Sequence, residues 1–370
     1  MPFVLLWLLF IAAVAVPRLG AEESAEKADS EKPVVPEVWV TSIASAPASG
    51  DAANRAHYAG TASGLLLRPA DVVRWQGADF GSRTVVMSHP VAVWCVQSSD
   101  DGSHVASTDY RGNLQILDTA TSMATMHEAA FERWTQTMRF VPGTDSIVAG
   151  NEAGKFFFWE EGKVAKSIDV DKNALTDIAF NAAKDRIAIS DGAGNVHFYS
   201  WPGLEASGKV KVGEGPAWCV EFTLDGTSIL VGSSDRKLYK CEAKDAATPT
   251  ALIDGTDWIT RVAVSTAGVI AAAEVGGKVY LLENDKAQPG EYKPAGMSPS
   301  GVWAVSWSGD RELLLGTRKN GVHSLGEAWA LSEFVPPKPA EAPATEAPAA
   351  EATPAPSADA KPEEKPADGK

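Results

Sequence analysis

One pattern of short apolar runs separated by turns recurs six times along this 370-residue chain. Each copy has a first apolar run, a turn cluster, a second apolar run, a tight polar turn and a third apolar run. The residues at the same place in the third run lie 40 to 43 positions apart: Leu117, Trp159, Tyr199, Cys241, Leu282 and Leu325. A repeat of this length is typical of the four-stranded blades of a β-propeller.

A seventh, more divergent copy precedes the other six, between Trp39 and Trp75. It contains the runs VWVTSIAS, HYAGT, GLLLR and DVVRW, with a long insertion after the first run. The runs are rich in β-branched and aromatic residues and are cut by turn residues, which favours strands, and no segment keeps helical periodicity over several turns.

One four-stranded sheet cannot bury both of its faces, whereas sheets packed face to face around an axis can. We therefore predict an all-β protein, a seven-bladed β-propeller of four-stranded antiparallel blades over residues 37–334. A closed ring is favoured over an open solenoid, and the segment WALSEF (Trp329 to Phe334) is a candidate for the outer strand of the last blade.

The repeats resemble those of the WD40 family. Ala217 to Gly226 (AWCVEFTLDG) and Val302 to Trp307 (VWAVSW) are similar to the family's first strand, and Leu117-Asp118 and Trp159-Glu160 are degenerate forms of its Trp-Asp pair. The Gly-His pair that opens many WD40 repeats is missing. The resemblance implies that the first strand of each blade lies innermost, beside a central channel. The missing Gly-His pair and the degenerate Trp-Asp pair imply that the family's buried His-Asp-Ser-Trp hydrogen-bond network is absent here.

A tryptophan stands near the start of the first strand in six copies, and Leu175 takes the neighbouring place in the fourth copy. The six residues are Trp39, Trp94, Trp134, Trp218, Trp258 and Trp303. Two interpretations remain open. The indoles pack between adjacent blades, or some of them are partly exposed at the mouth of the channel and form a binding surface for a partner. Asp109, Asp191 and Asp235 lie on the same rim, where they either cap their own turns or contact that partner.

The two ends of the chain differ from the repeats in composition. Residues 1–21 contain an apolar run, Phe3 to Val16, followed by small residues, which predicts a signal peptide; an uncleaved anchor is the alternative, because no Lys or Arg precedes the run. Residues 22–36 read as a charged linker. Residues 335–370 are rich in Pro, Ala and Glu, and predict a disordered tail. We expect an exported protein, periplasmic or extracellular, with membrane contact only if the first segment stays uncleaved.

The formal net charge of −15 makes a nucleic-acid partner unfavourable, because phosphate backbones would be repelled. The three cysteines, Cys95, Cys219 and Cys241, fit no complete disulfide framework, so we expect buried, unreactive thiols. Cys219 and Cys241 fall on strands two apart in one blade, too far apart for a disulfide.

Catalytic and metal-binding signals are weak. The six histidines are scattered without zinc-ligand spacing, and neither a G-x-S-x-G elbow nor a phosphate-binding Gly-rich loop is present. We therefore predict no catalytic residues, no metal and no cofactor. The leading hypothesis is a monomeric scaffold that binds a protein or peptide on its channel rim. The alternatives are a propeller enzyme (a hydrolase, lyase or quinone-dependent dehydrogenase) and a structural envelope-assembly factor.

Overall fold

A computed structural model describes residues 38–47, 54–77, 79–283, 290–292, 301–309 and 312–325. All of them belong to a unit of residues 1–337, and the second unit, residues 338–370, lies outside the described part. The predicted signal peptide (1–21), linker (22–36) and tail (335–370), and the segment Trp329 to Phe334, lie outside the described residues.

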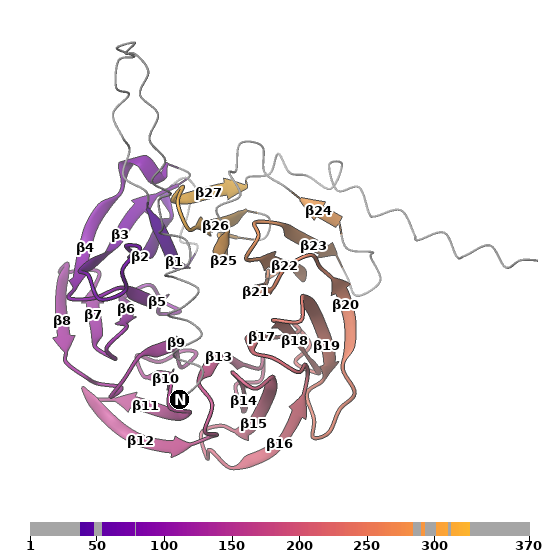
Figure 1. Ribbon diagram of the computed structural model, residues 1–370. Coiled ribbons are helices and arrows are strands. Elements are labelled where there is room, and N and C mark those ends of the chain that lie inside the picture. Colours follow the sequence, from indigo (N-terminus) through magenta and orange to yellow (C-terminus); the bar gives the residue numbers. More distant parts are fainter. Residues whose placement is uncertain are drawn as a thin grey trace, which may run out of the picture. The chain divides into compact units, whose positions relative to one another are not determined.

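Seven antiparallel sheets stand in a ring around a central axis (Figure 1). The strands of the first four blades, each given from the axis outward, are β1 (Trp39–Ser45), β2 (Ala56–Ala62), β3 (Ala70–Gln76) and β4 (Thr84–His89); β5 (Val93–Ser98), β6 (His104–Asp109), β7 (Leu114–Asp118) and β8 (Met123–His127); β9 (Thr135–Phe140), β10 (Ile147–Asn151), β11 (Lys155–Glu160) and β12 (Lys163–Asp169); β13 (Leu175–Phe180), β14 (Arg186–Asp191), β15 (Asn195–Ser200) and β16 (Ala206–Lys211).

The remaining three blades continue the same order around the ring. Their strands are β17 (Ala217–Phe222), β18 (Ser228–Ser233), β19 (Lys237–Glu242) and β20 (Thr250–Asp254); β21 (Ile259–Val264), β22 (Val269–Glu274), β23 (Val279–Glu283) and β24 (Gly290–Tyr292); β25 (Val302–Trp307), β26 (Leu313–Thr317) and β27 (Val322–Leu325). The last blade thus has three strands among the described residues. One short 3-10 turn, η2 (Phe80–Ser82), precedes β4. The predicted seven-bladed all-β propeller is confirmed.

Burial follows the position of a strand within its blade. The second strands are buried on both faces, and every residue of β18 is buried because neighbouring blades cover both of its sides. The outer strand β12 is exposed along most of its length and carries Lys163 and Lys166. The apolar second runs of the sequence are therefore the central layer of each blade.

Seven separate apolar clusters hold the ring together, and each joins two neighbouring blades. Between the third and fourth blades, for example, Val148 and Phe156 pack against Leu175 and Ile187. Stability thus comes from sheet-to-sheet burial of apolar side chains, as expected for blades that cannot bury both faces alone.

The seventh cluster closes the ring between the first and last blades. Val40 of β1 packs against Ala304 and Leu314 of the last blade. The backbone N–H of Val38 donates to Lys319 O, and Gly321 N–H donates to Val38 O, at distances of 3.0 and 3.1 Å. A closed ring, and not an open solenoid, is the observed arrangement.

The first blade differs from the sequence-based expectation. The run GLLLR is a turn between β2 and β3, in which Leu65 and Leu67 are exposed, and the fourth strand is β4. The hydroxyl of Ser63 donates to Leu65 O within this turn. A local hydrogen bond thus stabilises a turn although the sequence is apolar.

Candidate binding site at the channel mouth

The starts of the first strands and the turns between second and third strands share one rim, as the resemblance implied. Glu152 N–H donates to Trp134 O, and Val275 N–H donates to Trp258 O, both at 2.9 Å. Each of these bonds joins the turn between the second and third strands to the residue that precedes the first strand of the same blade. The tryptophans at the strand starts are therefore fixed at the level of this rim.

A narrow space lies on the axis at this level, and we call it the channel mouth. Its lining comes from Trp94, Gln136, Thr176, Trp218, Trp258, Thr260, Arg261 and Trp303. Four of the six predicted tryptophans thus face one space, although they are separated by up to five blades in the sequence.

The six indoles form two groups. Trp39 contacts Trp303 and Trp94 edge to face, with ring centroids 5.5 and 6.3 Å apart, and Trp94 contacts Trp134 at 4.9 Å. Trp218 stacks on Trp258 at 5.7 Å. In the fourth blade Leu175 is fully buried, which leaves a gap in the aromatic ring between Trp134 and Trp218.

Exposure divides the indoles between the two interpretations of the sequence. Trp39, Trp94 and Trp134 are buried, so they serve mainly as packing, although Trp94 also reaches the channel mouth. Trp218, Trp258 and Trp303 are partly exposed and present apolar surface to the hollow. Packing between blades thus describes three of the indoles, whereas a binding role for the three partly exposed ones stays a prediction.

An apolar turn borders the mouth on the side of the first blade. Leu66 and Trp303 both pack against the buried cluster of Trp39, Ala62 and Ala92, while Leu65 and Leu67 are 55% and 64% exposed. Exposed leucines next to partly exposed indoles enlarge the apolar area available to a partner. Sequence reasoning missed these residues because it assigned them to a strand.

Below the mouth the channel is wider, and its lining becomes polar. Arg139 (β9) donates to Glu221 (β17) at 3.2 Å and lies 3.6 Å from Asp177 (β13). Burial raises the pKa of the Glu221 carboxyl, and Asp177 adds to this effect, while Arg139 opposes it. No sequence signal predicts this cluster, since its members come from three blades and share no motif.

The three predicted aspartates on the rim cap turns. Asp109 accepts from Arg111 N–H and Asn113 N–H, and its side chain is fully buried. Asp191 is buried too and caps its turn in the same way, whereas Asp235 is partly exposed and accepts from Lys237 N–H and from the Tyr239 hydroxyl. Asp109 and Asp191 thus have no free surface for a partner.

The expected absence of a His-Asp-Ser network is wrong for the second blade. His89, which ends β4, contacts Asp109 at 3.1 Å through Nδ1 and Ser107 at 2.8 Å through Nε2, and all three are buried. Burial alone would raise the pKa of Asp109, but the hydrogen bonds from His89 and Asn113 outweigh burial and lower it. The sequence signal for this network is His89, which corresponds to the His of the family's Gly-His pair. Ser88 replaces the Gly of that pair.

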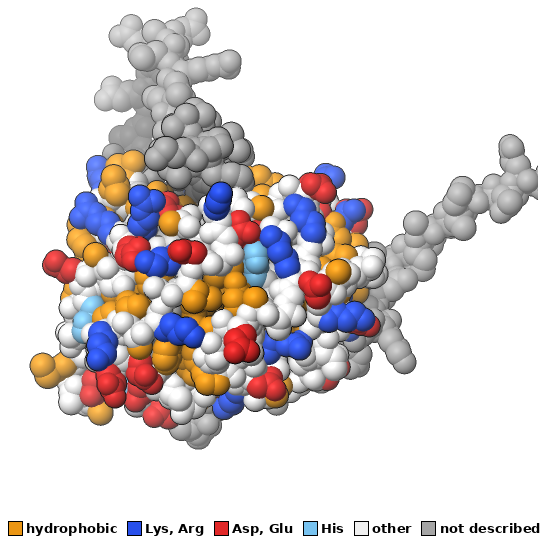
Figure 2. Space-filling view, turned by 90° about the horizontal axis from the view of Figure 1, so that it is seen from below, with side chains coloured by type: hydrophobic (Ala, Val, Ile, Leu, Met, Phe, Trp, Pro, Cys, Tyr) orange, Lys and Arg blue, Asp and Glu red, His pale blue; other side chains and the backbone are white. Residues whose placement is uncertain are grey.

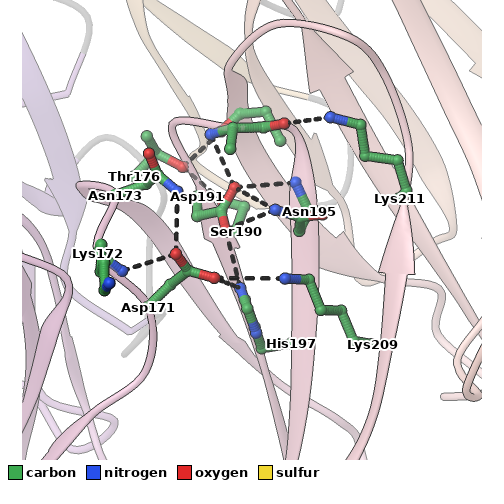
Figure 3. A network of polar contacts seen from close by, with 12 residues as sticks. Asp171, Lys172, Asn173, Thr176, Ser190, Asp191, Asn195, His197, Lys209 and Lys211 are labelled. Atoms are coloured by element: carbon green, nitrogen blue, oxygen red, sulfur yellow. Dashed lines mark hydrogen bonds and ion pairs between the residues drawn. The ribbon is translucent and has the colours of Figure 1, made fainter. Parts of the chain in front are cut away.

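A related network lies in the fourth blade (Figure 3). Oxygens of Asp171 and Asp191 and the Nε2 of His197 lie within 4.8 Å of one another, a spacing that a metal ion can bridge. However, Lys209 donates to Asp171 and Asn195 donates to Asp191, so protein donors already satisfy both carboxylates. We assign this network a structural role.

The cysteines are as expected. Cys95, Cys219 and Cys241 are free and buried, and burial raises the pKa of all three thiols, that of Cys241 to about 11. At neutral pH they remain protonated and act as apolar core residues.

The outer surface carries both signs of charge. Figure 2 shows the face seen from below in Figure 1, where β12 and β16 lie: apolar side chains form a band across its middle, and Lys, Arg, Asp and Glu alternate around it. This face offers no continuous basic surface of the kind that nucleic acids require.

Fold and repeats together define the class: a seven-bladed β-propeller with its inner strands around an axial channel. Residues 81–118, which include His89 and the second blade's first three strands, match the family described as WD domain, G-beta repeat. Residues 81–118 are therefore a WD40 repeat within a seven-bladed β-propeller, a fold that commonly serves as a protein-interaction scaffold. No curated protein matches the chain. Within the described part of the chain, we find no helix with the length and apolar character to cross a bilayer.

Proposed function

We propose that this propeller is an exported scaffold that binds a protein or peptide partner at the channel mouth and does not act as an enzyme. The observation that carries the proposal is the set of partly exposed indoles, Trp218, Trp258 and Trp303, around one hollow. Tryptophan is enriched among the residues that contribute most to binding energy, because a large apolar body is combined with one hydrogen-bond donor.

A capture experiment tests the binding site. The full-length protein is immobilised and exposed to an envelope extract, beside the variants Trp218→Ala and Trp303→Ala. Trp201→Ala is the matched control, because Trp201 lies between Phe158 and Phe180, outside the channel lining. We expect a retained protein that is lost with the two channel variants and kept with the control. Equal retention by all folded variants would remove the channel mouth as the site.

Export is tested separately by sequencing the N-terminus of the protein recovered from cells. Cleavage after Ala21 predicts a mature chain that begins at Glu22. A chain that keeps Phe3 to Val16 would instead support a tethered envelope-assembly role. Light scattering coupled to gel filtration checks the proposed monomer.

An enzyme remains the second candidate, because charged side chains converge inside the channel. Arg139, Asp177 and Glu221 meet there from three blades. Their mutual pairing supports a structural role, since Asp177 also accepts from Val220 N–H and Arg139 also donates to Ile178 O. Substrate screens with Glu221→Gln as the control distinguish the two: turnover that this variant abolishes would favour the enzyme.

A further inference from the structure

The polar part of the channel is a cavity of about 380 Å³, and we call it the chamber. Its lining extends along the first strands from Trp94, near the start of β5, to Ser98 and Val264, the last residues of β5 and β21. The space between the indoles at the mouth is about 20 Å³, which holds about one water, so a ligand would reach the chamber from the opposite end. The volume of the chamber lies within the range of small-molecule sites.

One wall of the chamber carries a net negative charge. Arg139 donates to Glu221 Oε2 at 3.2 Å and lies 3.6 Å from Asp177, so one guanidinium faces two carboxylates. The other oxygen of the partly exposed Glu221 side chain, Oε1, accepts no hydrogen bond from the residues that the structure describes. This oxygen can therefore accept from a ligand, and an ammonium group there would favour the ionised carboxylate.

The opposite charge comes from Arg261 (β21), whose partly exposed side chain also lines the chamber. Its guanidinium donates one hydrogen bond, to Thr260 O at 2.8 Å, and forms no ion pair with any residue in the described part of the chain. A guanidinium has five N–H donors, so several of those of Arg261 have no acceptor from the protein. Their planar arrangement fits a carboxylate, which accepts two parallel charge-assisted hydrogen bonds.

The positive and negative groups lie at different depths in the chamber. Arg261 and Glu221 come from neighbouring blades whose first strands start at equivalent residues, Ile259 and Ala217. Arg261 is the third residue of its strand and Glu221 is the fifth, so their side chains are attached about 7 Å apart along the strand direction. A ligand that contacts both groups therefore needs two charges separated by several bonds.

We propose that the chamber binds a small, extended zwitterion: its carboxylate pairs with Arg261, and its ammonium group donates to Glu221 Oε1. The lower effective dielectric constant inside the channel strengthens both interactions relative to water. A ligand with one charge would leave either the positive or the negative group of the chamber without a counter-ion. The chamber lies below the indoles and does not depend on the partner proposed for the mouth, so either proposal can fail alone.

The experiment titrates the full-length protein with three molecules of equal chain length in a calorimeter at neutral pH. 6-Aminohexanoate carries both charges, hexanoate has only the carboxylate, and hexylamine has only the ammonium group. We expect the zwitterion to bind at least about tenfold more tightly than either singly charged molecule, the factor that one charge-assisted hydrogen bond supplies. Glycine, whose two charges are too close together to reach both groups, should bind more weakly than 6-aminohexanoate.

Variants separate the two charged groups. Arg261→Gln should lower the affinity for 6-aminohexanoate to that for hexylamine, Arg261→Lys should keep part of the affinity, and Glu221→Gln should lower it to that for hexanoate. Arg236→Gln is the matched control, because Arg236 is exposed on the turn between β18 and β19, outside the chamber lining, and it should behave as the wild type. Thermal unfolding checks the fold of each variant, and if Glu221→Gln does not fold, the Arg261 variants and the three ligands still decide.

Three results would overturn the inference: equal affinities for the three molecules of equal length, a preference for the zwitterion that is unchanged in Arg261→Gln, or no binding of 6-aminohexanoate at millimolar concentration. Hexanoate that binds as tightly as 6-aminohexanoate would indicate a site for simple anions and reject the zwitterion. None of these results bears on the scaffold proposal, because that proposal depends on the captured partner and the Trp218 and Trp303 variants.

Discussion

At the scale of single residues, some buried carboxylates are satisfied by short-range contacts that fix the turns of the rim. Asp109 is the clearest case. Its carboxylate accepts from two backbone N–H groups, from the Asn113 amide and from His89. Removing such an acceptor leaves several buried donors unsatisfied, and each of these costs free energy.

We therefore expect Asp109→Ala to lower the free energy of unfolding by about 3 kcal/mol, which chemical denaturation measures. Asp235→Ala is the matched control, because Asp235 is partly exposed, and its effect should be about 1 kcal/mol. If both variants lose the same free energy of unfolding, burial of the Asp109 network contributes nothing to stability.

His57 gives a prediction for pH. Its side chain is buried beside Trp75, near the interface between the first and last blades. Burial lowers the pKa of His57 from 6.5 to about 4. Between these two values the unfolded chain binds a proton that the folded chain does not, so the free energy of unfolding falls as pH falls. The slope from His57 is at most about 1.4 kcal/mol per pH unit.

Replacing His57 by Phe removes this titration and keeps a ring against Trp75. The stability of His57→Phe, followed by chemical denaturation from pH 7 to pH 4, should fall less steeply than that of the wild type. Parallel curves for the two proteins would mean that His57 titrates alike in the folded and unfolded states.

At the scale of strands and turns, the second strands carry the tightest packing. Gly316 in β26 is the sharpest example, because a Cβ there would lie 2.5 Å from Val40 Cγ1 and 2.9 Å from Ala304 Cβ. Both neighbours are buried and rigid, so neither can move away cheaply.

Gly316→Ala should therefore destabilise the protein by about 1–3 kcal/mol in thermal or chemical unfolding, through overpacking. Gly64→Ala controls for the change in residue type, because nothing lies within 4 Å of its added Cβ and its φ is not in the left-handed region. A Gly316 variant as stable as the wild type would show that the seam accommodates a methyl group.

Most strands were predictable from the sequence, because apolar runs and turn residues repeat at a fixed spacing. The exception, GLLLR, shows why composition alone fails: Leu65 and Leu67 look like strand residues but protrude from a turn. The positions of the indoles were predictable too, since they share one place in each repeat. Their exposure was not, because it depends on the neighbouring blade. Arg139, Asp177 and Glu221 meet only in three dimensions, each about one repeat from the next.

At the scale of the molecule, the ring depends on seven equivalent interfaces, one of which joins the two ends of the array. Val40 at the closing interface and Val148 between the third and fourth blades are both fully buried in such clusters. If the closing interface is packed as tightly as the others, removal of the same methyl groups should lower the free energy of unfolding equally at both places.

We expect Val40→Ala and Val148→Ala each to lower the free energy of unfolding by about 2 kcal/mol, in a single transition followed by circular dichroism. A much smaller loss for Val40→Ala would indicate that the first and last blades separate readily. Two transitions in the Val40 variant would indicate that the array unfolds blade by blade once the seam is weakened.

The gap in the aromatic ring at Leu175 gives the mouth a direction. In a ring of seven identical indoles, a partner could bind in seven equivalent rotational positions about the axis, and no contact would favour one of them. Here four indoles run in contact from Trp303 to Trp134 along one arc, and Trp218 and Trp258 stand as a pair on the other. The pseudo-sevenfold symmetry of the backbone is thus lost at the level of side chains, and a partner that binds at the mouth as proposed would have one preferred rotational setting about the axis.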